Sequence, residues 1–81
     1  MMTRREALAL FESALEEKAG TMHEATLLQS LASWDSMGTL STMAIFEHNL
    51  DVTLAPERLA ACETAGDLLD LLRDKLQAVH R

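Results

Sequence analysis

The spacing of apolar residues along the chain predicts helices. Between residues 3 and 19 apolar side chains recur every three or four positions, as on one face of a helix, at Ala7, Leu8, Phe11, Ala14 and Leu15. Thr3, followed three residues later by Glu6, has the form of a capping box, and Gly20 is a natural helix stop. We therefore expect a first helix over about 3–19.

A second apolar period begins abruptly in the middle of the chain, at Met37, Leu40, Met43, Phe46 and Leu50. Asp35 precedes it and is a good N-cap, so we expect a second helix over about 36–50. Residues 20–35 then form a long loop, and a loop of this length in a compact domain is usually functional or packed by its own side chains. We expect its leucines to form a short helical turn over the bundle, at Leu27, Leu28 and Leu31.

The C-terminal half carries two further helix starts. Pro56 suits the first position of a short third helix, over about 56–61. Thr64 and Asp67 have capping-box spacing, and a broad apolar face follows them, which predicts a last helix over about 65–79. The expected fold is one all-α domain over 1–81, a small four-helix bundle with three main helices and a short third one.

Composition supports helices and narrows the function. Apolar residues make up 48% of the chain and aromatic residues 4%, so the core is aliphatic. The formal charge of −6 would repel nucleic acid and favours a basic protein partner. Cys62 is the single cysteine, which excludes an internal disulfide, and we expect it to be a small buried hydrophobe. With no apolar run of ~20 residues and no signal-peptide core, we expect a cytoplasmic protein. The small size of the chain favours a monomer.

The start of the second expected helix offers a candidate site. If Asp35 caps the helix, the hydroxyl of Ser36 is left free beside backbone N–H groups that favour an attached anion. A serine needs a neighbouring base to act as a nucleophile, and His48 lies 12 residues away, ~18 Å along a helix. We find no metal-ligand cluster and no glycine-rich phosphate loop, so we expect no catalytic residue, no metal and no enzyme.

Three segments resemble the acyl carrier protein family. They correspond to its Asp-Ser-Leu, Leu-Glu-x-x-Phe-x-Ile and Thr-x-x-Asp-Leu patterns, and together cover roughly the whole chain: Asp35-Ser36-Met37, Phe46-Glu47 with Leu50-Asp51-Val52, and Thr64-Ala65-Gly66-Asp67-Leu68. The resemblance implies that a phosphopantetheinyl transferase uses coenzyme A to place a 4′-phosphopantetheine arm on Ser36. The thiol of that arm would carry an acyl group as a thioester and present it to biosynthetic enzymes.

One departure from the family concerns the helix after the serine. Acyl carrier proteins usually show several acids there, but the outward positions of this chain are mainly uncharged: Gly38, Thr39, Ser41, His48 and Asn49. The resemblance therefore implies a specialised, stand-alone carrier. Partner recognition is expected at four residues, Asp35, Met37, Gly38 and Glu47. Gly38 either gives a partner a flat approach to Ser36 or has no role.

The cargo stays open at this point. Residues 35–39, Asp-Ser-Met-Gly-Thr, also resemble the Asp-Ser-x-Gly-Thr of D-alanyl carrier proteins, but their Trp-x-Thr-Pro is absent. We expect an acyl carrier in fatty acid, polyketide or specialised lipid biosynthesis. The alternatives are an aminoacyl carrier, of D-alanyl or peptidyl type, that an adenylating enzyme loads, and an unmodified acidic helical interaction domain.

Three more side chains carry structural expectations. Met37 is expected to be a core residue that locks the start of the second helix onto the bundle. Trp34 is expected to be a partly exposed loop aromatic that packs on Met37 or Leu40. Thr42, if it faces the bundle, needs a partner for its hydroxyl, most simply the carbonyl four residues earlier.

Overall fold

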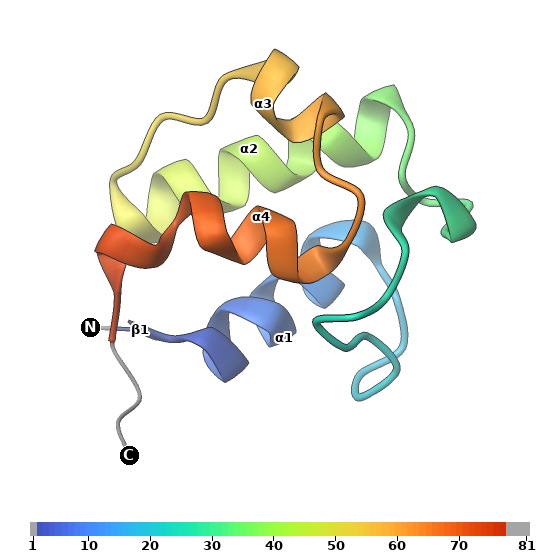
Figure 1. Ribbon diagram of the computed structural model, residues 1–81, viewed down its shortest axis with the longest axis horizontal. Helices are drawn as coiled ribbons and strands as arrows, with labels where there is room; N and C mark the ends of the chain where they lie inside the picture. Colours follow the sequence, from blue (N-terminus) through green and yellow to red (C-terminus); the bar gives the residue numbers. More distant parts are fainter. Residues whose placement is uncertain (1, 78–81) are drawn as a thin grey trace.

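A computed structural model describes residues 2–77 and shows a helical bundle (Figure 1). Its elements are β1 (Met2–Thr3), α1 (Arg4–Leu15), the 3₁₀ helix η1 (Leu28–Ser30), α2 (Ser36–Leu50), α3 (Pro56–Ala60), α4 (Ala65–Leu71), the 3₁₀ helix η2 (Arg73–Lys75) and β2 (Leu76–Gln77). Helix α1 packs against α2 and α4, α3 crosses one side of the bundle, and the long α1–α2 loop closes one end. The all-α prediction is confirmed, and a short parallel contact of two residue pairs, Met2 with Leu76 and Thr3 with Gln77, is added to it.

The first helix begins where its capping box predicts but ends early. The Thr3 hydroxyl accepts the N–H of Glu6 at 3.1 Å, and the Glu6 carboxylate accepts the N–H of Thr3 at 2.9 Å. The helix ends at Leu15 rather than near residue 19. The carboxylate of Glu12 is buried and accepts the N–H of Met22 at 2.8 Å, which requires the chain to fold back over α1. This contact, invisible in the local pattern, explains the early end.

The last helix is also shorter than expected. It ends at Leu71 instead of about residue 79, and η2 and β2 follow it. Leu76 is buried and pairs with Met2 in the parallel β1–β2 contact, so the backbone here is extended and cannot continue the helix. Val79, counted on the apolar face of that helix, lies outside the described residues. By contrast, α2 coincides with the expected 36–50, and α3 ends one residue before the expected 61.

The core joins all four α-helices. Its buried hydrophobic residues are Ala7, Phe11, Leu15, Met22, Leu28, Phe46, Leu54, Leu59, Cys62, Ala65, Leu68, Leu69, Leu72 and Leu76. Trp34 is half-buried against this core, with its ring edge-on to Phe11 at a centroid distance of 5.7 Å. Trp34 is thus partly exposed as expected, and its aromatic partner is Phe11, a residue that the local pattern did not indicate.

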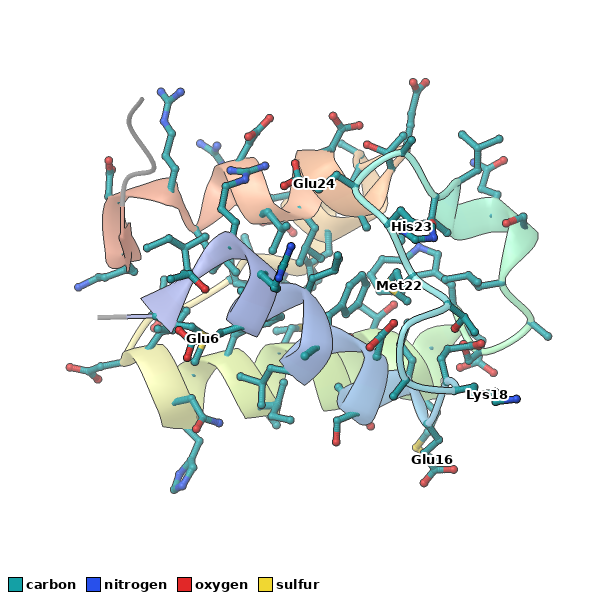
Figure 2. All side chains as sticks on the ribbon, turned by 90° about the horizontal axis from the view of Figure 1, so that it is seen from below. Glu6, Glu16, Lys18, Met22, His23 and Glu24 are labelled. Carbon is teal, nitrogen blue, oxygen red and sulfur yellow. The ribbon has the colours of Figure 1, made fainter. Side chains whose placement is uncertain are left out.

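The long loop between α1 and α2 is held against the bundle by a buried leucine and by an ion pair. Leu28 is fully buried in η1, which confirms the expected helical turn, but Leu27 is 58% exposed and does not cover the bundle as expected. Figure 2 shows the loop running from Lys18 near the end of α1, through Met22 and His23, to Glu24 beside α4. There the Glu24 carboxylate accepts two hydrogen bonds from the Arg4 guanidinium, at 2.7 and 3.0 Å. These contacts hold the segment that leads to α2.

Candidate functional site

Ser36 occupies the first position of α2, and its side chain takes no part in capping. Asp35 is the N-cap, with an extended backbone, and its carboxylate accepts the N–H of Gly38 at 2.8 Å. The Asp35 carbonyl accepts both the N–H of Thr39 at 2.8 Å and its hydroxyl at 2.9 Å. Ser36 itself is exposed. The sequence-based candidate is therefore a surface hydroxyl on a firmly capped helix start.

The first turn of α2 presents positive backbone charge to the solvent. Within residues 2–77, the N–H groups of Ser36 and Met37 have no hydrogen-bond acceptor, and the turn contains no acid. The helix dipole adds a partial positive charge at the same end. A phosphodiester on Ser36 would gain about 0.3–1 kcal/mol from this environment.

Gly38 is required by packing. A Cβ atom at this position would lie 2.0 Å from the carbonyl oxygen of Ser33 and 2.9 Å from Cδ2 of Leu15. The Ser33 hydroxyl donates to the Glu17 carboxylate at 2.5 Å, which fixes this part of the loop against the end of α1. Gly38 is buried, so any role of this residue in partner recognition would be indirect and stays a prediction.

Met37 contradicts its expected core position. The side chain is 73% exposed, and Leu40, one turn later, is 61% exposed. The buried positions of α2 are instead Gly38, Thr42 and Phe46, spaced four residues apart. Because the loop carbonyl packs against Gly38, the helix turns its neighbouring methionine outward. An apolar strip on α2, formed by Met37, Leu40 and Ala44, therefore faces solvent.

Two of the remaining expectations concern buried polar atoms. Thr42 is fully buried, and its hydroxyl donates to the Gly38 carbonyl at 2.8 Å, as expected for a threonine facing the bundle. Cys62 is buried as expected, and burial first, then the charges of Asp67 and Asp70, raise the pKa of its thiol. A thiol with a raised pKa stays protonated and is a poor nucleophile.

A groove lies beside Ser36, between the end of α1 and the start of α2. It encloses about 210 Å³ and is lined by Ala14, Leu15, Glu16, Ser33, Asp35, Met37, Gly38 and Ser41. The sequence pattern did not lead us to expect Glu16, Ser33 and Ser41 at this site. The small residues Gly38 and Ser41 could have indicated the groove, because they lie three positions apart on one helix face and permit a close approach. The fourth expected recognition residue, Glu47, is exposed but lies about 16 Å along the helix from Ser36.

The chain has the fold of a solved acyl carrier protein. The solution NMR structure of the holo acyl carrier protein from Geobacter metallireducens aligns over 100% of both chains with a TM-score of 0.73 and 21% sequence identity. No family model matches the chain, and no curated protein sequence matches it either. The likeness therefore establishes the acyl carrier protein fold. In the described part of the chain, no helix is both long and apolar enough to cross a membrane.

Proposed function

We propose that this chain is an acyl carrier protein that holds its acyl group on a 4′-phosphopantetheine arm attached to Ser36. One observation carries the proposal: in a chain of this fold, the exposed hydroxyl of Ser36 stands at the first position of a fifteen-residue helix. Because Asp35 supplies the cap, Ser36 is free to accept a group. The chain then acts as a carrier rather than an enzyme.

The residues around Ser36 fit a phosphodiester. The serine oxygen would form a new bond to the phosphorus that bears pantetheine in coenzyme A, and the bond to the adenosine bisphosphate leaving group would break. The hydroxyl proton would pass to a base of the transferase, since His48 lies ~18 Å along the helix. When bound, the arm supplies a terminal thiol that carries the acyl group as a thioester. Cys62 could not replace this thiol because it is buried.

The surface next to Ser36 supports a specialised set of partners. These would be a phosphopantetheinyl transferase, a loading enzyme and downstream biosynthetic enzymes. The partner-facing surface would combine the exposed apolar side chains of Met37 and Leu40 with acids at its two ends, Asp35 and Glu47. A partner that binds this surface mainly through apolar contacts would need fewer basic residues than a partner that binds an acidic helix. A cytoplasmic location and a monomeric state belong to the same proposal.

Intact-mass measurement tests this function directly. After incubation with coenzyme A and a broad-specificity transferase, the wild-type chain should gain the mass of one phosphopantetheine group. Ser36→Ala should gain nothing. Ser41→Ala is the matched control, a serine on the same helix, and should be loaded like wild type. No gain in the wild type, or a gain that survives Ser36→Ala, would refute the proposal.

The packing of Gly38 also bears on the cargo. The Asp-Ser-x-Gly-Thr likeness to D-alanyl carriers depends on a glycine that the Ser33 carbonyl requires for steric reasons. That glycine therefore gives no preference between an acyl and an aminoacyl cargo. Loading of the holo chain by an adenylating enzyme with an amino acid would favour the aminoacyl alternative. If Ser36→Ala leaves the activity in the cell unchanged, the chain is instead an unmodified interaction domain.

A further inference from the structure

The groove between the end of α1 and the start of α2, here the α1–α2 groove, is bounded by the neighbours of the proposed attachment residue. Asp35 and Met37 flank Ser36 in the sequence, and both line the groove. Three other grooves in the described chain are lined by residues 27–30 with 63, or by residues 52–71, and none of these has a lining residue from α2. Of these four grooves, the α1–α2 groove is therefore the one bounded by the neighbours of Ser36.

The residues that line this groove supply several hydrogen-bond acceptors. The last carbonyls of a helix lack intrahelical partners. At the end of α1, the carbonyls of Glu12 and Ser13 are taken by returning N–H groups, whereas those of Ala14 and Leu15 receive none within residues 2–77. The exposed side chain of Glu16 adds a carboxylate. These acceptors suit a ligand that carries N–H or O–H donors.

Apolar atoms complete the groove, and its size limits the ligand. Ala14, Leu15 and Met37 supply methyl and thioether groups beside the acceptors. The volume of about 210 Å³ lies below the roughly 300 Å³ at which sites for drug-sized ligands begin. The groove can therefore take part of an extended molecule, with short apolar and polar groups in alternation, but not a long acyl chain in addition.

We propose that the α1–α2 groove holds the pantetheine segment of an arm attached to Ser36. This rests on the proposed function. Pantetheine is neutral, and it carries a hydroxyl, two amide N–H groups and a pair of geminal methyl groups, which match the acceptors and apolar atoms of the lining. Tethering gives the segment an effective concentration in the mM range, so contacts too weak to bind free pantetheine suffice. The thiol and its cargo stay outside the groove, accessible to enzymes.

Isotope-filtered NMR of the holo protein tests the proposal. The chain is labelled with ¹³C and ¹⁵N, loaded from unlabelled coenzyme A, and its mass is measured first. The expected result is a set of cross-peaks between the geminal methyl protons of the arm and the methyl groups of Ala14 and Met37. A loaded chain without these cross-peaks overturns the groove proposal and leaves the carrier function standing. A chain that gains no mass overturns both.

A pair of variants separates groove binding from general disturbance. Ser41→Leu places a large side chain in the groove, and Ala44→Leu adds the same side chain one turn later, at an exposed position. Both should be loaded, and both should unfold cooperatively. The cross-peaks to Ala14 should be lost in Ser41→Leu and kept in Ala44→Leu. Cross-peaks that persist in Ser41→Leu, or vanish equally in both variants, would contradict the proposal.

Discussion

At the N-terminus of α4, the backbone N–H groups are all hydrogen-bonded to neighbouring groups. The Thr64 hydroxyl accepts the N–H of Asp67, and the Asp67 carboxylate accepts the N–H groups of Thr64 and Glu63. The first two N–H groups of α4, those of residues 65 and 66, donate to loop carbonyls of Thr26 and Glu24. Every early donor of this helix thus has a partner, and the loop that supplies the carbonyls is held in place.

The N-terminus of α2 begins with a similar cap but stays open. Asp35 caps it as Thr64 caps α4, yet the third helical position is Gly38 where α4 has Asp67. No acid can return there because the Ser33 carbonyl occupies the space that a side chain would need. The first two N–H groups of α2 stay free, beside the exposed Ser36, because within residues 2–77 no loop carbonyl accepts from them as Thr26 and Glu24 accept from those of α4.

The largest effect on stability should come from adding a side chain at Gly38, where the Ser33 carbonyl packs against the start of α2. Gly38→Ala brings a Cβ into the Ser33 carbonyl and should lower the free energy of unfolding by about 3 kcal/mol. Gly66→Ala in α4 is the matched control, because its Cβ would lie 3.0 Å from the Glu24 carbonyl oxygen. It should stay within about 1 kcal/mol of wild type. Urea denaturation measures both, and equal losses would contradict the steric explanation.

Substitutions of the two N-cap residues, Thr64 and Asp35, should have different effects on stability and on the loading of Ser36. Thr64→Ala should cost about 1 kcal/mol in urea denaturation and leave the loading rate of Ser36 unchanged. Asp35→Asn keeps an N-cap acceptor, so stability should change by only a few tenths of a kcal/mol. The loading rate by the transferase should nevertheless fall, because the proposed partner surface includes the Asp35 carboxylate. If Asp35→Asn is loaded at the wild-type rate, the Asp35 side chain serves only as the N-cap of α2 and is not part of the partner surface.

The smallest effect should be a pH dependence that belongs to α4. Hydrogen bonds from the N–H groups of Glu63 and Thr64 lower the pKa of Asp67 below its ordinary 3.8. A pKa lower in the folded chain than in the unfolded chain gives stability that is present above the unfolded value and lost as pH falls through the folded one. Thermal melts below about pH 4 should show a shallower loss in Asp67→Asn than in wild type. If the melting temperatures of wild type and Asp67→Asn fall in parallel with pH, Asp67 does not contribute to the pH dependence of stability.

Local signals in the sequence predicted the helix starts well. Each start depends on residues within one turn, such as Thr3 with Glu6, Thr64 with Asp67, and Asp35 before Ser36. The candidate serine could be identified for the same reason, since capping and exposure at a first helical position are local properties.

The helix ends and the orientation of α2 depended on distant residues. The end of α1 follows from the buried contact between Glu12 and the N–H of Met22, and the end of α4 from the pairing of Leu76 with Met2. The apolar period that starts at Met37 suggested the wrong inward face, because a loop carbonyl packs against Gly38. Contacts between segments far apart in the chain decide these features, and no local pattern encodes them.

Localising the added group tests the central claim most directly. Cleavage of the loaded wild-type chain after Lys18 and Arg58 releases peptide 19–58, which contains four serines, Ser30, Ser33, Ser36 and Ser41. Fragmentation of this peptide in the mass spectrometer should place one phosphopantetheine on Ser36 and none on the other three. An unmodified peptide, or a group on any other serine, would contradict the account.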